Sequence, residues 1–150
     1  MNNMENRRNF LKKSALGTLG VSTVMSCNKP KKTSSKPVFP RIISTWNHGL
    51  DANKKAWEVL KNGHGGLSAV EEGVKVTEAD PNVRSVGLGG YPDRDGIVTL
   101  DACIMDKDSN CGSVSYLQNI KHPISVARHV MEDTPHVMLS GSGALDFAIS

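Results

Sequence analysis

The stretch from 87 to 106, GLGGYPDRDGIVTLDACIMD, gathers the glycine, acidic and basic residues that ion-binding and phosphate-binding loops require. A calcium loop supplies oxygen ligands at alternating positions and closes with a distant acidic residue. Here Gly96 follows Asp95 directly, and the closing position is Ala102, which has no side-chain oxygen. A dinucleotide-binding loop follows a strand and opens a helix, whereas these glycines precede a strand-like run. The pattern therefore favours a turn, in which Asp93 and Asp95 cap backbone amides.

A serine between two glycines is a second candidate for chemistry, because a nucleophile elbow places its serine in such a turn. That motif, G-x-S-x-G, requires glycines two positions before and two positions after the serine. Around Ser142 these positions hold Ser140 and Ala144. Gly141 and Gly143 alone are a weak phosphate-binding signal, and a tight turn from strand to helix explains them.

The cysteines and histidines are the residues that could form a disulfide bond or hold a metal ion. A predicted hairpin around KDSN pairs Asp106 with Asn110, which sets Cys111 opposite Met105 and diagonal to Cys103. Cysteine Cα atoms separated by much more than about 7 Å cannot be bridged without moving the backbone, so we expect two buried thiols. No metal site or cofactor is expected, because no pair of histidines has zinc-motif context and each is expected to be solvated or packed: His48, His64, His122, His129 and His136.

Trp46 stands in TWN, where a predicted strand ends and a loop begins. Residues at such positions often belong to functional sites, because a rigid element holds them at its edge. Packing in the core is the other interpretation, and the residue pattern alone leaves both open. Trp57 lies near the apolar side of a predicted helix, where packing is the simpler interpretation.

The elements that would position these residues begin with RIISTW (41–46), a β-branched run that predicts a strand. Asp51 is then the predicted N-cap of a helix that Gly63 ends. A second helix is expected to open with the capping box Ser68–Glu71 and to stop at Asp80–Pro81. Both helices carry residues at helical spacing that are predicted to face inward: Ala52, Ala56, Val59 and Leu60 in the first, and Val70, Val74 and Thr77 in the second.

Beyond the hairpin strands, the second half of the sequence predicts a third helix and a further strand–helix unit. Alternating residues from Ile97 to Ile104 give the first hairpin strand one nearly wholly apolar face. Pro123 suits the first turn of a helix over 123–133. Residues 136–150 predict a strand, a glycine turn and the start of another helix. Because that helix is still apolar where the sequence stops, we expect the chain to be the N-terminal portion of a longer polypeptide.

The first forty residues do not have the composition of a folded core. Arg7 and Arg8 precede FLKK and an apolar run of roughly a dozen residues, which is too short to span a bilayer. Residues 1–27 therefore resemble a twin-arginine export signal. The signal ends at VMSC, a degenerate lipobox that makes Cys27 a candidate for lipid attachment, and residues 28–40 form a polar tether. These features predict export to the periplasm and leave open a lipid anchor in a membrane.

The net charge of +3 comes from the N-terminal segment, where four basic residues outweigh Glu5. The remaining basic and acidic residues balance, and no basic stripe or aromatic stacking platform appears from Ile42 onward. The sequence therefore argues against nucleic acid binding.

Three segments, 44–60, 84–106 and 119–148, together resemble the glycosylasparaginases (aspartylglucosaminidases) of the N-terminal nucleophile hydrolases. The likeness runs from about Ile42 to Ile149, and its most specific block is GG-P-RDG-V-LDA-IMD. The resemblance implies an α+β fold of the αββα sandwich type, of which residues 41–150 would supply the N-terminal part. It also implies that the 87–96 loop belongs to the scaffold and binds no phosphate.

The resemblance further implies a mechanism whose nucleophile lies beyond Ser150. Members cut themselves before a threonine, and the new α-amino group serves as base for the hydroxyl of that residue. On this reading the chain is the inactive α portion of an amidohydrolase that acts on N-acetylglucosaminyl-asparagine. Its partners would be the β portion of the same precursor and a second α/β unit in a dimer. The resemblance makes Trp46 a substrate-binding residue beside the nucleophile.

Two alternative functions remain open. An L-asparaginase or isoaspartyl peptidase would use the same scaffold, and a membrane-tethered binding lipoprotein would keep the sheet and lack the threonine.

Asp133–Thr134 resembles the cleavage dipeptide of the family, but Pro135 follows it and the context is a helix end leading into a strand.

Overall fold

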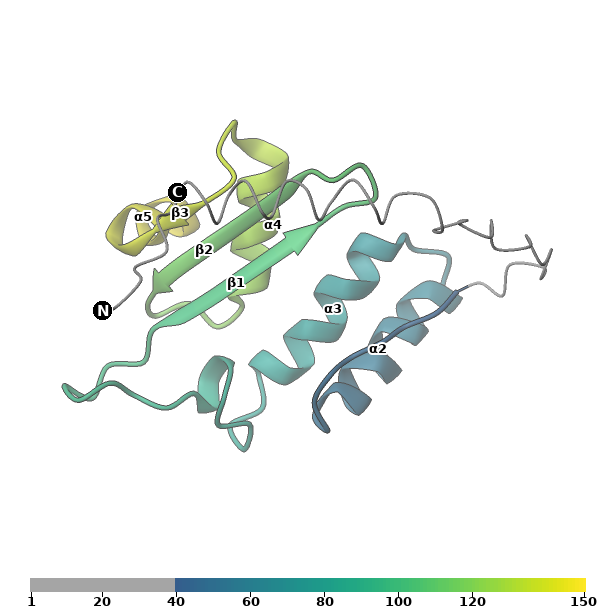
Figure 1. The fold of residues 1–150 in the computed structure, drawn as a ribbon, viewed down its shortest axis with the longest axis horizontal. Helices are drawn as coiled ribbons and strands as arrows, with labels where there is room; N and C mark the ends of the chain where they lie inside the picture. Colours follow the sequence, from purple (N-terminus) through teal and green to yellow (C-terminus); the bar gives the residue numbers. More distant parts are fainter. Residues whose placement is uncertain (1–39) are drawn as a thin grey trace, which may run out of the picture. The chain divides into compact units, whose positions relative to one another are not determined.

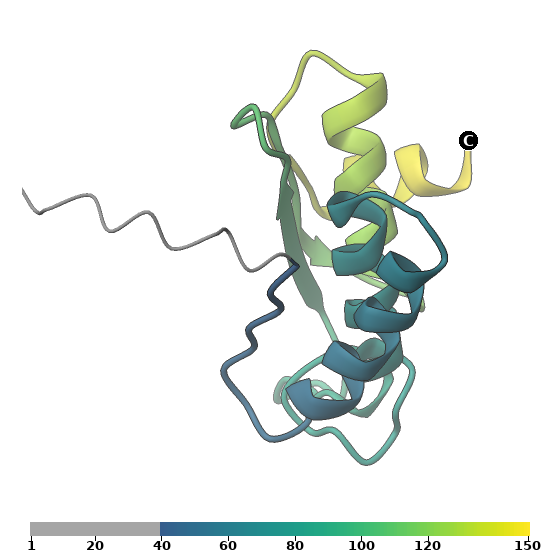
Figure 2. The same cartoon turned by 90° about the vertical axis from the view of Figure 1, so that its right-hand side faces the viewer.

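The computed structural model describes residues 40–150, in which helices cover one face of a small sheet (Figures 1 and 2). The fold class is α+β, as predicted. The elements follow one another as α2 (Gly49–Lys61), α3 (Gly66–Glu78), the 3₁₀ turn η1 (Gly87–Gly89), β1 (Leu100–Met105), β2 (Cys111–Leu117), α4 (Pro123–Asp133), β3 (Leu139–Ser140) and α5 (Gly141–Ile149). Within residues 40–150, no helix is long and apolar enough to cross a membrane. The predicted export signal with Cys27, and the predicted tether up to residue 39, lie outside the described residues.

Helices α2 and α3 form a tight antiparallel pair. Gly63 adopts a φ of +84° after the end of α2, and its N–H donates to the Leu60 carbonyl at 3.0 Å. This is the left-handed stop that the sequence predicts. The helices approach so closely that a Cβ at Gly73 would lie 2.8 Å from the Ala52 carbonyl oxygen. The interface buries Ala56, Val59 and Ala69.

Both predicted helix starts were wrong. Helix α2 begins at Gly49, so Asp51 lies within the first turn and pairs with Lys54 instead of capping the helix. Helix α3 begins at Gly66 without a side-chain cap. The predicted capping box fails because the Glu71 carboxylate turns toward α4, where it meets cationic and hydroxyl partners.

The hairpin of β1 and β2 has the predicted register. Met105 lies opposite Cys111, and the Asp106 N–H donates to the Asn110 carbonyl at 2.9 Å. Strand β3 adds to the other edge of β2 in parallel, which gives the order β1-β2-β3. The pairing slips between Leu100 and Ala102, so β1 is irregular at the end nearest α3.

The main core lies between the sheet and α4. Helix α4 has the predicted bounds. Its buried residues Ile124, Val126, Ala127 and Val130 pack on the inward side chains of the hairpin, which are Ile104, Val114 and Leu117. Glycine is required at position 112, because a Cβ there would overlap the backbone of Ala127 and Met131. The contact fixes the height of α4 above the sheet.

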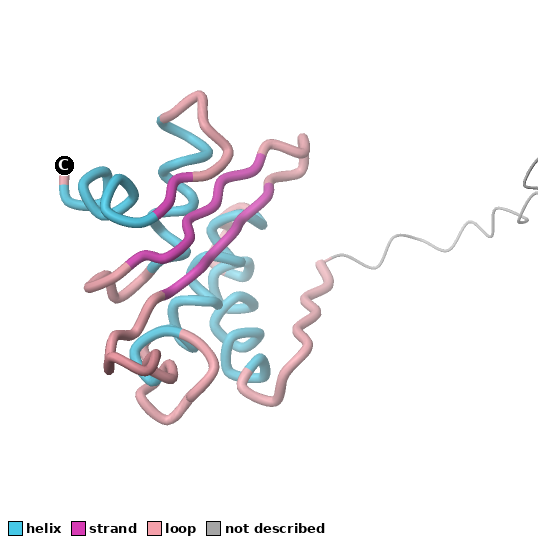
Figure 3. The backbone as a smooth tube through the Cα atoms, turned by 60° about the vertical axis from the view of Figure 1, so that its left-hand side comes forward, coloured by secondary structure: helices cyan, strands magenta, loops and turns pink. Residues whose placement is uncertain are grey.

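Three further predictions were wrong. Residues 41–46 form a loop (Figure 3), and Ile43 is 88% exposed, because no strand within residues 40–150 pairs with this segment. Cys103 and Cys111 are free thiols, as predicted, but Cys103 is exposed and Cys111 half-buried, because both lie on the sheet face that the helices leave open. Val70 is 52% exposed instead of facing inward.

Candidate functional site

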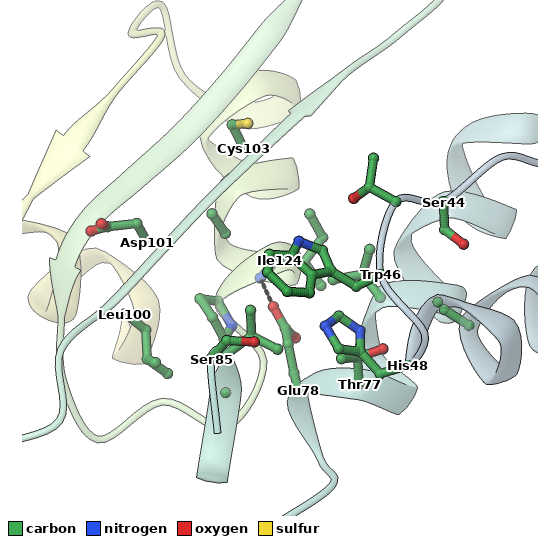
Figure 4. Close-up of a pocket in the computed structure, with 18 of the residues that line it drawn as sticks. Ser44, Trp46, His48, Thr77, Glu78, Ser85, Leu100, Asp101, Cys103 and Ile124 are labelled. Carbon is green, nitrogen blue, oxygen red and sulfur yellow. Dashed lines mark hydrogen bonds between the residues drawn. The ribbon is translucent and has the colours of Figure 1, made fainter. Parts of the chain in front are cut away.

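A cavity of about 420 Å³ lies where the helices, the sheet and two loops meet (Figure 4). Loop 44–49 with the start of α2, the last turn of α3, loop 85–87, strand β1 and the first turn of α4 line its wall. The cavity gathers aromatic, imidazole and carboxyl side chains around an otherwise apolar wall, which is the usual composition of a small-molecule site.

Trp46 lies at this cavity with 68% of its surface exposed. Its carbonyl accepts the Gly49 N–H at 2.9 Å, so the turn that starts α2 fixes its backbone. Within residues 40–150, Trp46 is therefore not packed in a core. Whether Trp46 contacts a substrate stays a prediction.

His48 stacks on Trp46, with ring centroids 6.2 Å apart and ring planes only 6° from parallel. Both ring nitrogen atoms are buried, and neither has a hydrogen-bond partner within residues 40–150. The packed ring agrees with the sequence interpretation of a solvated or packed histidine, which did not foresee that the ring nitrogens would lack partners. The sequence signal that could have indicated the stacking is the position of His48, two residues after Trp46.

Glu78, the last residue of α3, is 3% exposed and lines the floor of the cavity. Its Oε1 accepts the Ile124 N–H at 3.0 Å, and its Oε2 lies 3.3 Å from Nδ1 of His122. Burial raises the pKa of the Glu78 carboxyl to about 7, an effect that the Ile124 N–H and Lys75 only partly offset. The cavity floor therefore carries a carboxyl group that is largely protonated below neutral pH.

The pKa of His122 shifts in the opposite direction to that of Glu78, and this shift also favours the neutral form of the side chain. Burial lowers the pKa of its imidazole, and the nearby charges of Lys121 and Lys75 lower it further. The neutral forms of both groups are thus favoured, and a protonated Oε2 of Glu78 can donate to an unprotonated Nδ1 of His122. At pH values where Glu78 is protonated and His122 is neutral, the Glu78–His122 contact is best described as a neutral hydrogen bond.

Close backbone contacts require glycine at positions 87 and 89 of the GLGG segment. Gly87 adopts a φ of +60°, and a Cβ there would overlap the Cα and carbonyl of Glu78. A Cβ at Gly89 would meet the carbonyl oxygens of Pro81 and Val83. These glycines let the 3₁₀ turn pack directly on the end of α3, where it supports Glu78.

The acidic loop after these glycines is a structural turn. Asp93 Oδ1 accepts the N–H groups of Asp95 and Ile97, each at 2.9 Å, and Gly96 takes a φ of +83°. The predicted turn is confirmed for Asp93 and Gly96. Asp95 caps no amide of residues 40–150, and its carboxylate lies 3.6 Å from Nε of Arg94.

Asp101 and Ser85 add polar groups to the cavity wall. Asp101 Oδ1 accepts the Tyr116 N–H at 2.9 Å, across the irregular end of β1. Tyr116 has a φ of +52°, so this bond holds a backbone conformation that tyrosine rarely adopts. Sequence reasoning assigned neither Asp101 nor Ser85 a role at the site.

A second buried carboxylate, Glu71, ties α3 to α4 outside the cavity. It pairs with Arg128 at 2.8 Å and with Lys75 at 2.9 Å, and Ser125 donates to it at 2.6 Å. Burial alone would raise the pKa of Glu71, but the hydrogen bonds from Ser125, Lys75 and Arg128 together lower it to about 2. Glu71 is thus a structural anion.

The remaining sequence candidates lie away from the cavity. Ser142 sits in the first turn of α5, after Gly141 makes the predicted strand-to-helix turn with a φ of +60°. Thr134 follows the end of α4, as predicted, and its Oγ1 donates to the Val130 carbonyl at 2.7 Å. No group of three metal-ligating side chains is placed to hold an ion in the described part of the chain.

Comparisons with known proteins agree with the pattern of residues. The Asparaginase family model (Asparaginase_2) matches residues 41–150. An N(4)-(beta-N-acetylglucosaminyl)-L-asparaginase of Elizabethkingia miricola is 54% identical, over 100% of this chain and 44% of its own length. The enzyme of that name from Rattus norvegicus is 41% identical, over 81% of this chain and 35% of its own length. The chain therefore spans less than half the length of these relatives, and it belongs to the asparaginase family.

Proposed function

We propose that this chain is the N-terminal portion of a glycosylasparaginase, which hydrolyses the amide between N-acetylglucosamine and the asparagine side chain. Its products would be aspartate and the amino sugar. One observation carries the proposal: identity of 54% along the whole chain to a relative with that named activity. The cavity between Trp46 and Glu78 supports it, because a small polar amide fits such a site.

The chemistry of bond cleavage would come from a threonine that lies downstream of Ser150. Autoproteolysis would free the α-amino group of that threonine, which then acts as base for its own hydroxyl. The residues of this chain would bind and orient the substrate. Trp46 would provide a rigid apolar wall with one N–H donor, and it would help to exclude water from the reacting amide.

The downstream portion would also complete the fold as an αββα sandwich. The helices leave one face of the sheet open (Figure 2). Cys103 and Met105 are exposed and flank the buried Ile104 in β1, so they lie on the face opposite to the core. A second sheet packed there would bury them. We further propose a dimer of such α/β units, export through the twin-arginine signal, and lipid attachment at Cys27.

Expression of the complete reading frame tests the function directly. The purified protein would be offered N-acetylglucosaminyl-asparagine, L-asparagine and an isoaspartyl dipeptide, and mass spectrometry would identify its chains. The proposal expects two chains, with threonine at the start of the second, and preference for the glycosylated substrate. Preference for either other amide would indicate the asparaginase or isoaspartyl peptidase rival. A single uncut chain that hydrolyses none of them would indicate the binding lipoprotein.

A further inference from the structure

Glu78 places an ionisable group on the cavity floor, where few groups can neutralise its charge. Figure 4 shows its buried side chain reaching toward Ile124 at the base of the cavity. No lysine or arginine of residues 40–150 lines the cavity. Lys75, a cation on the same helix, is held by Glu71 and Glu72 at 2.9 Å each. A charge on Glu78 would therefore act on a ligand across the largely apolar cavity.

The hydrogen bonds of Glu78 fit both of its protonation states. Oε1 accepts the Ile124 N–H at 3.0 Å in either state. Oε2 lies 3.3 Å from Nδ1 of His122, and a neutral imidazole can carry its proton on either ring nitrogen. A protonated Oε2 donates to Nδ1, whereas an ionised Oε2 accepts from an Nδ1–H. The carboxyl can thus gain or lose its proton without losing a partner.

His122 also connects this carboxyl to a different surface. It lines a second cavity, of about 430 Å³, between α4 and the end of α5. Its side chain is 29% exposed, and its Nε2 is neither bonded nor buried within residues 40–150. When Oε2 passes its proton to Nδ1, Nε2 can release its own proton on this side, so one proton leaves and the imidazole stays neutral. Glu78 can therefore change its charge while a ligand fills the main cavity.

The proposed reaction changes the charge of the molecule that occupies the main cavity. Glycosylated asparagine has a neutral amide in its side chain, and hydrolysis converts that amide into the carboxylate of L-aspartate. Burial raises the pKa of the Glu78 carboxyl to about 7, so the floor is mostly neutral below this pH and mostly anionic above it. An anionic floor repels the carboxylate of the product, whereas it does not repel a neutral amide.

We propose that Glu78 selects between ligands of the cavity by their charge: when ionised, it weakens binding of the carboxylate product relative to neutral ligands of similar size. The proposal rests on the proposed function for the identity of the product. Glu78 acts through its electric field, and His122 is the positioning residue that keeps it hydrogen-bonded in both states. Release of the product is therefore favoured above neutral pH.

Binding to the complete, processed protein tests this selection apart from catalysis. L-Homoserine is the neutral counterpart of L-aspartate, because a hydroxymethyl group replaces the side-chain carboxylate and the α groups are the same. Isothermal titration would measure both Kd values from pH 5 to pH 9. The ratio of the aspartate Kd to the homoserine Kd should rise with pH in wild type. We expect this rise to be about 3- to 50-fold larger than in Glu78→Gln, as for one charge acting across the cavity.

The comparison with Glu78→Gln isolates the carboxyl from the other ionisable groups near the cavity. These groups are His48, Asp101 and Cys103 on the cavity wall, Lys75 and Glu71 on α3, and His122 on α4. Their effects, and that of the α-amino group of the proposed threonine, remain in Glu78→Gln. Glu58→Gln is the matched control and should follow wild type, because Glu58 is exposed on α2 and lies outside the cavity lining.

His122→Phe tests the positioning role. The variant removes the N–H donor to the ionised carboxyl, and a hydrogen bond to a charged group contributes more than one to a neutral group. The midpoint of the rise should therefore move to higher pH. An unchanged midpoint would remove His122 from the proposal.

The same rise in wild type and Glu78→Gln would overturn the charge selection. If Glu78→Gln does not fold, infrared spectra of wild type near pH 7 decide. The band of a protonated protein carboxyl must grow when ¹³C-labelled L-aspartate is added, and it must grow less with L-homoserine. Equal bands with the two ligands would refute the proposal.

These measurements also separate the selection from the proposed function. A protein that shows the pH-dependent ratio but hydrolyses no glycosylated asparagine would refute the function and keep the selection. Hydrolysis of glycosylated asparagine, with the same pH dependence of the ratio in wild type and Glu78→Gln, would do the reverse.

Discussion

The Glu78 carboxyl, at the end of α3, accepts the Ile124 N–H in the first turn of α4 at 3.0 Å. A side chain from one helix thus caps another helix 46 positions later in the sequence. Because the same carboxyl forms the cavity floor, its charge state links the stability of this junction to the electrostatics of the site.

The raised pKa of Glu78 predicts a pH-dependent loss of stability. A carboxyl whose pKa is about 7 in the folded state and 4.5 when unfolded favours folding below pH 4.5, and this contribution is lost as pH rises through 7. The shift corresponds to about 3 kcal/mol. Glu78→Gln, which still accepts the Ile124 N–H, should abolish this loss and melt higher than wild type at pH 8.

Melting curves of the complete protein at pH 5 and pH 8 check this prediction. The lowered pKa of His122 gives a pH dependence of opposite sign, in which stability is lost as pH falls below about 6.5. Comparing Glu78→Gln with wild type at each pH isolates the carboxyl. Parallel melting temperatures of the two proteins across this range would contradict the assignment.

Gly87→Ala should destabilise the protein strongly. Besides the φ of +60°, the new methyl group would overlap the backbone of Glu78. We expect a cost of about 2–4 kcal/mol, with a weakened cavity floor. Gly63→Ala is the control, because Gly63 has a φ of +84° but no atom within 4 Å of the added Cβ. Its cost should be about 1 kcal/mol, and equal losses in the two variants would show that the contact with Glu78 is unimportant.

Trp46→Ala should fold and self-cleave but lose catalytic efficiency. We expect a loss of about ten- to a thousandfold in kcat/KM, or about 1.4 to 4 kcal/mol of transition-state binding, with Trp46→Phe in between. A core tryptophan would instead cost about 3–5 kcal/mol of stability with near-normal turnover. Kinetics and thermal melts on both variants decide between these results. Trp57→Ala, on α2 and outside the cavity lining, should leave kcat/KM unchanged.

Glu71→Gln should weaken the α3–α4 junction at neutral pH. A pKa of about 2, below the usual 4.5, means that the charge of Glu71 stabilises the fold above pH 4.5 and that this is lost as pH falls toward 2. Because Arg128 and Lys75 are partly exposed, we expect about 2–3 kcal/mol. Glu72→Gln, whose partner is the same Lys75, should cost under about 0.5 kcal/mol. Similar melting temperatures for both variants at pH 7 would rule out a special role for Glu71.

Export depends on the paired arginines if the N-terminal signal is read by the twin-arginine machinery. Arg7→Lys combined with Arg8→Lys keeps the charge and should hold the precursor in the cytoplasm. Lys12→Arg with Lys13→Arg is the charge-preserving control and should be exported. Cell fractionation with immunoblotting measures the outcome, and normal periplasmic or membrane yield of the first double variant would disprove the signal.

Sequence reasoning succeeded where the determinants are local. The hairpin register follows from the turn between Asp106 and Asn110, and the bounds of α4 follow from Pro123 and its apolar spacing. The stop at Gly63 and the turn at Gly96 need only positive φ values. Each of these features is set by residues a few positions apart.

Sequence reasoning failed where the role of a residue depends on a partner that is distant in the sequence. Glu71 looked like half of a capping box, but its partners Ser125 and Arg128 lie more than fifty positions away. Residues 41–46 have strand propensity but no neighbouring strand in the described part of the chain. Glu78 and His48 are ordinary in sequence, and only burial beside the cavity makes them unusual.

The helical hairpin of α2 and α3 and the β-hairpin of β1 and β2 indicate an order of folding. Helices α2 and α3, and strands β1 and β2, are neighbours in sequence, so each pair closes a short loop at small entropic cost. The cavity requires slower, long-range closures, because the end of α3 must meet β1 and the first turn of α4. We therefore expect both hairpins to form first and the cavity to be assembled in the last step. The cavity would then also be the first region to open when the native state fluctuates.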